Sequence, residues 1–432
     1  MTAATLPRVQ RLLHAGPGVA TDPGLAGHLA LHGPVAVPGR RDAAWAGALL
    51  AEVSASGLTG RGGGGFPAAA KWEALRRSGR RPVVVVNAME GEPASAKDRT
   101  LLTWTPHLVL DGAELVAVLA GARSVAVCVA DDRDGTARAV EAAIAERAGR
   151  PGAPAMSVLR PPARYVTGEE SALAHWIADG DARPVLRVDK SLPLRAGRRT
   201  VLVHNAETLA QVALIARHGA GWFRSVGTDE APGTTLVTVT GGVQAPGVVE
   251  VELGTPVADV VQRCGPSGPI AGFLVGGYGG AWLAPELAST PYAPTPLARA
   301  GATHGVGIVV ALPTTSCGIA ETARIARWMA GQSAGQCGPC VYGLPALADD
   351  LELLAAGRAD GSVVGRLDQR ARSVVGRGAC RHPDGVARLV RSALSVFAAD
   401  AGAHAAGRPC DGRHAASVLP FPRTAALGSV AS

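Results

Sequence analysis

The sequence predicts an α/β protein with a mostly parallel sheet, followed by a small α+β module and a helical C-terminal region. Over about the first 230 residues, short apolar runs alternate with segments of helical periodicity, as in βαβ units. Residues 233–290 then hold alternating, strand-like segments around Gly/Pro turns, and amphipathic helices follow from residue 318.

The composition excludes several classes of protein. The chain has 432 residues, of which 47% are hydrophobic and 18% charged, so we expect several packed domains and no extensive disorder. The net charge of +7 is spread without a Lys/Arg block, and only 4% of residues are aromatic, so a nucleic-acid partner is not expected. The sequence has no long apolar run and no apolar leader, which predicts a cytoplasmic protein with no direct membrane span.

The periodicity places the elements of the first layer in a definite order. They are a helix over 41–56, a strand over 82–86, a helix over 105–121, a strand over 123–130, a helix over 136–147 and a strand over 156–160. In the later chain we expect a short helix over 256–263, a strand over 304–312 that leads into the helical region, and a helix over 318–330.

A glycine-rich stretch, GLTGRGGGGFP over residues 57–67, is the first candidate site. Consecutive glycines let the backbone approach a flat or charged ligand and point N–H groups at it. Pro67 fits the first turn of a helix with Lys71 one turn further, and such a helix start suits a phosphate. The stretch is neither a Rossmann fingerprint nor a Walker A loop, and a flexible loop is the alternative.

The segment NAMEGEPASAKDR, residues 87–99, follows the strand over 82–86 and so lies at a carboxyl end, where open α/β sheets bind ligands. Asn87 has the groups to hydrogen-bond a heterocycle, and Glu90 and Glu92 can accept from ribose or amide groups. The alternative is a polar loop whose charges pair with one another. Two further polar segments, 164–171 and 204–208, are explained by helix starts alone.

The cysteines near the end suggest a metal centre. Cys337 and Cys340 form a C-x-x-C pair, Cys380 follows, and thiolates so arranged can share a soft metal. Three cysteines suit an iron–sulfur cluster with one other ligand, whereas zinc would need a fourth ligand such as His382. A thioredoxin-type redox pair, which needs a βαβ context, and metal-free structural thiols are the alternatives.

Taken in this order, the segments resemble the NADH-binding flavoprotein of respiratory complex I and its relatives in NAD-linked hydrogenases and formate dehydrogenases. The pieces that carry the resemblance are GLTGRGGGGFPAAAKW, NAMEGEPASAKDR with the following PHLVLDGAELVA, YVTGEESAL, HNAETLA and QCGPC…GAC. They span roughly residues 50–400.

The resemblance implies four regions. They are N-terminal helices with an FMN-binding, Rossmann-like α/β domain (1–230), a β-grasp (SLBB) domain (231–300), a helical iron–sulfur domain (301–405) and a flexible tail (406–432).

The resemblance also implies a set of residues that line the flavin and the nicotinamide nucleotide, with no side-chain acid or base required for hydride transfer. These cofactor-binding residues are Gly60, Arg61, Gly62, Gly63, Gly64, Gly65, Phe66, Lys71, Asn87, Glu90, Glu92, Tyr165, Gly168, Glu169, Glu170 and Asn205. The implied cluster ligands are Cys337, Cys340 and Cys380.

The implied activity is that of an NADH dehydrogenase-type oxidoreductase subunit. Hydride would pass from NADH to FMN, and electrons would then pass through a [4Fe–4S] cluster to a partner or quinone pathway. The implied partners are other electron-transfer subunits, among them a thioredoxin-like [2Fe–2S] subunit.

Three positions depart from the family pattern: Met89 stands where an Asp is usual, Lys190 where an aromatic is expected, and Ala334 where the first cluster cysteine belongs. The cluster would then be completed by Cys317, Cys410 or His382, remain incomplete, or be absent. These departures motivate a second hypothesis, a degenerate homologue that binds flavin or nucleotide without cluster-dependent electron transfer. A zinc-stabilised binding module is the third.

Overall fold

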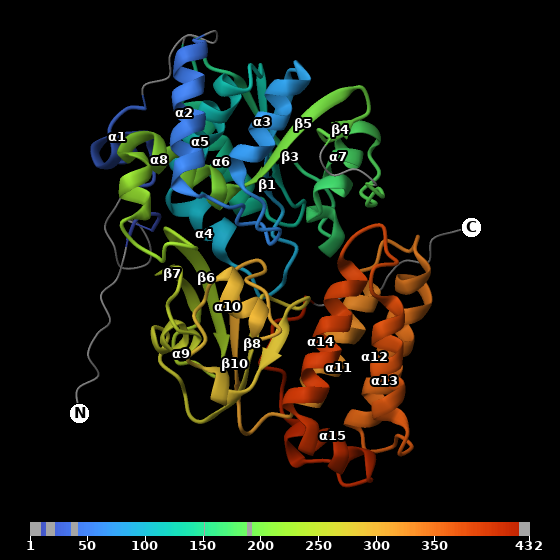
Figure 1. Cartoon of the computed structure of the whole chain (residues 1–432). Coiled ribbons are helices and arrows are strands. Elements are labelled where there is room, and N and C mark those ends of the chain that lie inside the picture. Colours follow the sequence, from blue (N-terminus) through green and yellow to red (C-terminus); the bar gives the residue numbers. More distant parts are fainter. Residues whose placement is uncertain (1–9, 14–21, 36–41, 151, 188–191, 423–432) are drawn as a thin grey trace, which may run out of the picture.

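The computed structural model describes residues 10–13, 22–35, 42–150, 152–187 and 192–422. Lys190 lies outside these residues. Figure 1 shows three regions: an α/β domain, a smaller sheet-containing domain below it, and a group of helices beside the small domain. Among the described residues, none of the helices is long and apolar enough to cross a membrane.

The first sheet has the strand order β3-β2-β1-β5-β4. Strands β1, β2, β3 and β5 are parallel, and the short β4 pairs antiparallel with β5 at the edge. Their bounds are β1 Pro82–Ala88, β2 Ser124–Val129, β3 Ala155–Leu159, β4 Arg195–Ala196 and β5 Arg199–Asn205. The six expected elements of this layer all occur, each end within two residues of its predicted place.

Both faces of this sheet are covered, which explains why its strands are nearly continuous apolar runs. Val84 and Val86 point into one core together with residues of α5 and α8, whereas Val85 joins a second core with residues of α7. Cys128 is fully buried in this second core, as predicted for a small hydrophobe. The helices of the domain are α1 Leu25–His32, α2 Ala43–Ser56, α3 Ala68–Ser78, α4 Lys97–Trp104, α5 Pro106–Leu119, α6 Asp134–Glu146, α7 Glu170–Asp179 and α8 Ala206–Arg224, with a 3-10 turn at Tyr165–Gly168.

The second sheet has the order β7-β6-β10-β8-β9, with β6 and β10 parallel and the other pairs antiparallel. Its elements are β6 Thr234–Gly241, β7 Gly247–Glu252, α9 Val257–Gln262, β8 Ile270–Val275, β9 Ala281–Leu283, a 3-10 turn at Pro285–Leu287, α10 Pro294–Arg299 and β10 Ile308–Pro313. Strand β10 occupies the centre of the sheet. The second domain therefore extends past residue 300, where the sequence analysis placed its end.

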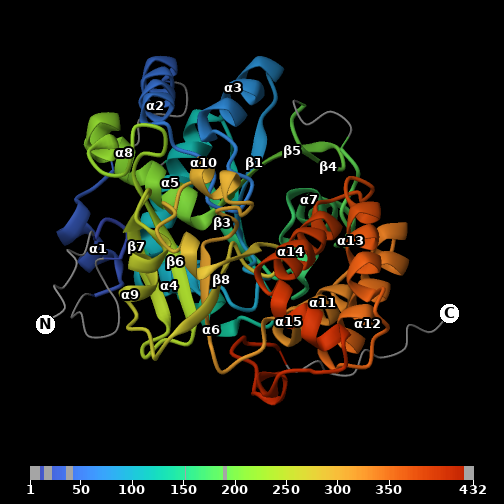
Figure 2. The ribbon, with the colours of Figure 1, turned by 60° about the horizontal axis from the view of Figure 1, so that its bottom comes forward.

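The C-terminal helices pack around a core of their own that includes Ile325, Leu351, Leu367 and Leu389. In both ribbon views they lie beside the second sheet (Figure 1, Figure 2). Trp282 of β9 packs edge-on against Phe397. Their bounds are α11 Gly318–Gly331, a π-type turn at Pro339–Gly343, α12 Leu344–Ala355, α13 Val363–Val374, α14 His382–Val396, α15 Ala398–Ala405 and a 3-10 turn at Asp411–His414.

Residues 406–422, expected to form part of a flexible tail, lie along the helical domain. Arg324 donates to the backbone oxygens of Arg413 and Ala415, and the Tyr278 hydroxyl donates to the Pro420 oxygen. Leu419 is buried among the helices. The tail expectation is therefore wrong for these residues, because apolar burial and backbone hydrogen bonds hold the segment in place. Residues 423–432 lie outside the described residues.

Candidate flavin and iron–sulfur sites

The order of the first sheet defines where a ligand can bind. From β1 the sheet continues through β2 and β3 on one side, whereas β5 lies on the other side. Asn87 at the end of β1 is in register with Asn205 at the end of β5. The two asparagines therefore mark the carboxyl edge at the point where the strand order reverses, which is where open α/β sheets bind ligands.

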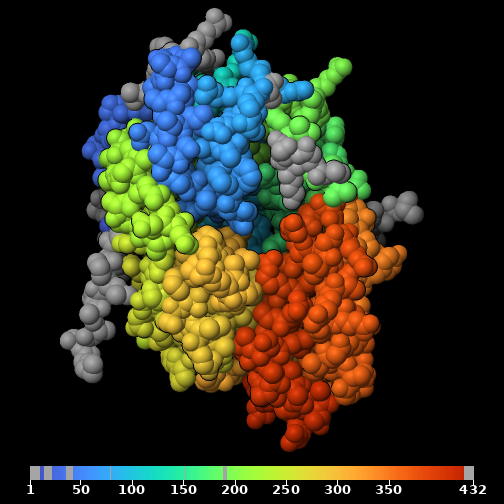
Figure 3. Space-filling model, in the orientation of Figure 1, coloured from blue at the N-terminus to red at the C-terminus, as the bar shows by residue number. Residues whose placement is uncertain are grey.

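A cleft of about 480 Å³ opens beside this edge. Figure 3 shows a hollow where the surfaces of the α/β domain, the small domain and the helical region meet. Nine of the predicted cofactor-binding residues line the cleft: Gly62, Gly63, Asn87, Glu90, Glu92, Tyr165, Gly168, Glu169 and Asn205. The structure thus brings together segments that are far apart in the sequence.

The glycine loop approaches the cleft with bare backbone. A Cβ atom on Gly62 would lie 3.3 Å from Asn205 Cβ, and one on Gly63 would lie 3.3 Å from Val306 Cγ1. Gly63 also has φ +98°, a conformation that side chains disfavour. The close approach to Asn205 and Val306 requires glycine at both positions and leaves bare backbone at the cleft, which a flat ring such as the isoalloxazine of FMN can approach.

Asn87 and Asn205 are held in place by hydrogen bonds. Asn87 Nδ2 donates to the Gly168 oxygen at 2.8 Å, which joins the end of β1 to the start of α7. Asn205 caps α8 by accepting from the Glu207 N–H, and its Nδ2 donates to Asp98 Oδ2 at 2.7 Å. Glu169 caps α7 by accepting from the N–H groups of Ser171 and Ala172.

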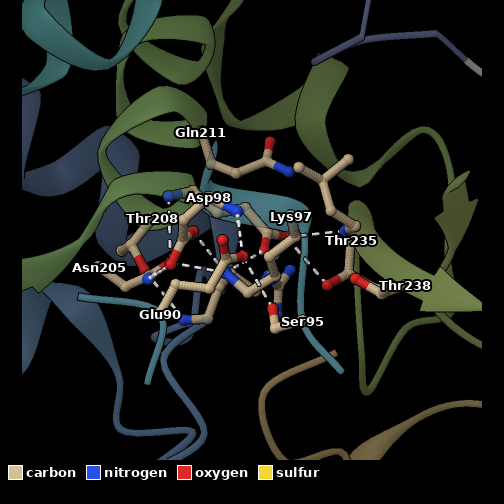
Figure 4. Close-up of polar contacts among 12 residues, drawn as sticks. Glu90, Ser95, Lys97, Asp98, Asn205, Thr208, Gln211, Thr235 and Thr238 are labelled. Carbon is tan, nitrogen blue, oxygen red and sulfur yellow. Dashed lines mark hydrogen bonds and ion pairs between the residues drawn. The ribbon is translucent and has the colours of Figure 1, made fainter. Parts of the chain in front are cut away.

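A buried cation, Lys97, lies beside the Asn205 amide (Figure 4). Lys97 Nζ lies 2.7 Å from Asp98 Oδ1, 3.1 Å from Glu207 Oε2 and 3.0 Å from Asn205 Oδ1. Burial alone would lower the pKa of Lys97, but the adjacent carboxylates of Asp98 and Glu207 outweigh it and hold the pKa above its usual value. Lys97 is therefore a permanent cation in the wall of the cleft, and the carboxylates of Asp98 and Glu207 balance its charge.

The carboxylate of Glu90 accepts hydrogen bonds from neighbouring groups of the protein. It accepts from Ser95 Oγ and from the N–H groups of Asp98 and Arg99, in the first turn of α4. Burial, followed by the nearby Asp98, raises the pKa of Glu90. Glu90 has φ +44°, and it is the only residue other than glycine with positive φ among the described residues.

Glu92 lies deeper in the same wall. It accepts from the Tyr278 N–H at 3.1 Å and from the hydroxyl of Tyr165. Burial raises the pKa of Glu92 to about 8, despite these donors. This carboxyl group therefore holds a proton near neutral pH.

Seven predicted cofactor-binding residues are not among the described residues that line the cleft: Gly60, Arg61, Gly64, Gly65, Phe66, Lys71 and Glu170. The Arg61 side chain is buried and its guanidinium donates to Thr59 Oγ1 and the Thr234 oxygen, toward the second sheet. Lys71 and Glu170 form an ion pair between α3 and α7, and Phe66 is half exposed.

Met89, where an acidic residue was expected, is buried in the core between the sheet and α7. Its Cβ would be 3.5 Å from a Cβ on Gly168. The substitution therefore replaces a potential hydrogen-bond acceptor near Gly168 by apolar packing.

The three predicted cluster cysteines converge. Cys337, Cys340 and Cys380 line one small pocket together with Ala334 and His382. Cys337 Sγ accepts from the Ala379 N–H, and Cys380 Sγ accepts from the His382 N–H. Burial raises the pKa of Cys340 to about 12, so without a metal this thiol is protonated and unreactive. Thiolates in this number fit an iron–sulfur cluster, with Ala334 at the position of the missing fourth cysteine.

Cys317 and Cys410, two candidates for a fourth cluster ligand, lie elsewhere. Together with His404 they form a separate group whose ligand atoms all lie within 4.8 Å of one another, the only such group of three among the described residues. Cys317 Sγ caps α11 by accepting from the Ala320 N–H, and His404 Nε2 accepts from the Cys410 N–H. Two thiols and an imidazole so close together are a ligand set that a single soft metal ion takes.

Comparisons with known proteins agree with this geometry. Residues 53–214 match the Nuo51 FMN-binding domain, residues 236–266 the SLBB domain, and residues 320–404 the NADH-ubiquinone oxidoreductase-F iron–sulfur binding region. An NADH-quinone oxidoreductase subunit of Rhizobium meliloti (strain 1021) is 30% identical, over 83% of this chain and 89% of its own length. The chain belongs to the family of NADH-quinone oxidoreductase flavoproteins.

Two further comparisons extend this result. NADH dehydrogenase [ubiquinone] flavoprotein 1 of Dictyostelium discoideum, a mitochondrial protein, is 30% identical over 81% of this chain and 77% of its own length. The crystal structure of an NAD+-reducing [NiFe]-hydrogenase in the H2-reduced state matches with a TM-score of 0.77 and 31% identity. That match covers 85% of this chain and 63% of the hydrogenase chain. The fold class and the family predicted from the sequence are confirmed.

Sequence reasoning missed part of the cleft. The described lining also includes Ser95, Lys97, Asp98, Gly276, Gly279, Thr303, Gly305, Val306 and Arg388. Two signals were available: the FLVGGYGG run, in which tight glycine turns bring backbone to the cleft, and the position of Lys97, one of only three lysines in the chain.

Proposed function

We propose that this chain is the NADH-oxidising flavoprotein of a larger electron-transfer complex. One observation carries the proposal: Val166, Cys380 and His382 line both the glycine-lined cleft and the pocket of the three thiols. A flavin in the cleft and a cluster on the thiols would therefore be separated by a single layer of residues. FMN supplies the chemistry that links a two-electron hydride donor to a one-electron carrier.

The residues of the chain position the ligands and do not react. The backbone of Gly62 and Gly63 would cover a ring, and the amides of Asn87 and Asn205 would meet its polar edges. Lys97 stays cationic and holds Asp98, Glu207 and Asn205 in place, and the buried wall at Glu92 excludes water. We place the nicotinamide nucleotide in the same cleft.

The partner is proposed from the relatives, whose names describe a component of a quinone oxidoreductase and an NAD+-reducing hydrogenase. A thioredoxin-like [2Fe–2S] subunit in the cytoplasm is the partner we favour. The degenerate alternative, flavin binding without a cluster, is motivated by Met89 and Ala334. Iron and sulfide analysis separates the two, because the alternative requires a chain without iron.

The test is anaerobic purification of the full chain, followed by flavin quantitation and addition of NADH. We expect bound FMN whose absorption bleaches with NADH. Gly63→Val should lose the flavin, because the side chain enters the cradle at a positive φ. Gly64→Ala is the control, since a Cβ there meets no atom within 4 Å. Flavin retained by Gly63→Val, or a flavin that NADH does not bleach, would count against the proposal.

A further inference from the structure

The fourth corner of the thiol pocket has no cysteine. Ala334 lines the pocket beside Cys337, Cys340 and Cys380, and its methyl group cannot bind iron. Cys317 and Cys410 lie in the separate group with His404 and are not among the described residues that line this pocket. A fourth ligand from the described residues would therefore come from another side chain of the pocket wall.

Among the described residues of this wall, His382 has a buried ring nitrogen with no hydrogen-bond partner. It begins α14, two residues after Cys380, and 6% of it is exposed. Its Nε2 lies 2.9 Å from the Met329 backbone oxygen, which can only accept, so Nε2 carries the hydrogen. In the neutral ring Nδ1 then carries a lone pair, and this atom is buried without a hydrogen-bond partner among the described residues.

Resting on the proposed function, we propose that His382 Nδ1 is the fourth ligand of a [4Fe–4S] cluster held by Cys337, Cys340 and Cys380. An unpartnered buried nitrogen costs free energy unless something occupies it, and iron in the same pocket would do so. The bond from Nε2 to a backbone oxygen is also the usual support of a metal-bound histidine, because it fixes the tautomer and the ring orientation.

The ligand has a consequence for electron flow. A neutral imidazole in place of a thiolate removes one negative charge from the cluster, which makes its reduction easier and raises its potential. His382 also lines the flavin cleft, and its ring centre lies 5.3 Å from that of Tyr165. His382 therefore lies in the wall that the thiol pocket and the cleft share.

The test uses the full chain, prepared anaerobically with ¹⁵N-labelled histidine, and reads the reduced cluster by pulsed EPR together with iron and sulfide content. We expect a nitrogen coupling from a directly bound histidine in the parent protein. His382→Cys should keep the four-iron cluster, lose the coupling and lower the potential. His382→Ala should yield a three-iron cluster, visible by EPR in the oxidised protein.

The rescue variant guards against a simple folding defect. Adding Ala334→Cys to His382→Ala restores four cysteine ligands, so we expect a four-iron cluster without nitrogen coupling. Two results would overturn the ligand assignment: a four-iron cluster in the parent protein without nitrogen coupling, or an EPR spectrum that does not change in His382→Ala. Neither result would affect the bleaching of the flavin by NADH. If the parent protein binds no iron after reconstitution, both the His382 assignment and the proposed electron path are wrong. If NADH does not bleach the flavin, only the proposed NADH-oxidising function is wrong.

Discussion

Lys97 Nζ lies 3.1 Å from Glu207 Oε2, in an ion pair whose two side chains are 2% and 0% exposed. Glu207 also accepts from Thr235 Oγ1 and from the Leu236 N–H at the start of β6. This one carboxylate therefore connects helix α4, which begins at Lys97, with helix α8 and the second sheet.

The first prediction follows from this pair. Lys97→Met would leave Asp98 as a buried carboxylate without its cation, and Glu207 with only the Arg61 guanidinium 3.9 Å away, which costs about 3–5 kcal/mol of folding free energy. Arg372→Met is the control, because its ion pair with Asp368 is exposed and such pairs contribute about 0–1 kcal/mol. Denaturant unfolding of both variants measures the difference. If both variants lost the same free energy of unfolding, the buried Lys97 ion pairs would contribute no more to stability than an exposed pair.

The second prediction concerns pH. The pKa of Glu92 is about 8 in the folded chain, against an ordinary value of 4.5. As the pH rises from 4.5 to 8, the unfolded chain gives up this proton first and the folded chain keeps it. The contribution of Glu92 to the free energy of unfolding is therefore fully present below pH 4.5 and is lost as the pH rises through 8.

Glu92→Gln removes this titration and keeps a similar shape. We expect the free energy of unfolding to fall less between pH 5 and pH 8 in the variant than in the parent, by a few kcal/mol at most. The comparison isolates Glu92, because Glu90 and Asp98, whose pKa values are also raised by burial, are present in both proteins. Parallel pH profiles would mean that Glu92 is ionised in the folded protein at neutral pH.

Part of the site could be predicted from local signals, whereas Tyr165, Gly168, Glu169 and Asn205 were expected only from the family resemblance. An apolar run that ends in Asn87 identifies both a buried parallel strand and the polar residue at its carboxyl end. The run of glycines likewise predicts a segment without side chains, whose backbone a ligand can approach. These signals depend on neighbouring residues only, so the order of the elements and the position of the cleft could be predicted.

The remaining parts depend on contacts between distant segments. Arg61 was expected at the cofactor, yet its guanidinium turns to the Thr234 oxygen because the second sheet supplies a buried acceptor there. No local pattern indicates that Lys97 meets Glu207 or that β10 inserts between β6 and β8. The unpartnered nitrogen of His382 is equally a product of tertiary packing, since Met329 belongs to another helix.

The third prediction tests the packing that supports the sheet. Helices α5 and α8 approach closely at Gly112, where a Cβ atom would lie 1.9 Å from the Leu209 backbone oxygen. Gly112→Ala must therefore push the two helices apart, which costs about 3 kcal/mol or more even after the better helix propensity of alanine. Because α8 carries Asn205 at its start, we also expect weaker flavin binding.

Gly135→Ala is the matched control for this change. Gly135 lies in the first turn of α6, is exposed, and a Cβ there meets no atom within 4 Å. Alanine should leave stability unchanged or raise it by up to about 1 kcal/mol. Thermal unfolding and flavin titration of both variants measure the two effects. If Gly112→Ala were as stable as Gly135→Ala, the two helices could separate freely, and the close contact at Leu209 would not fix the position of Asn205.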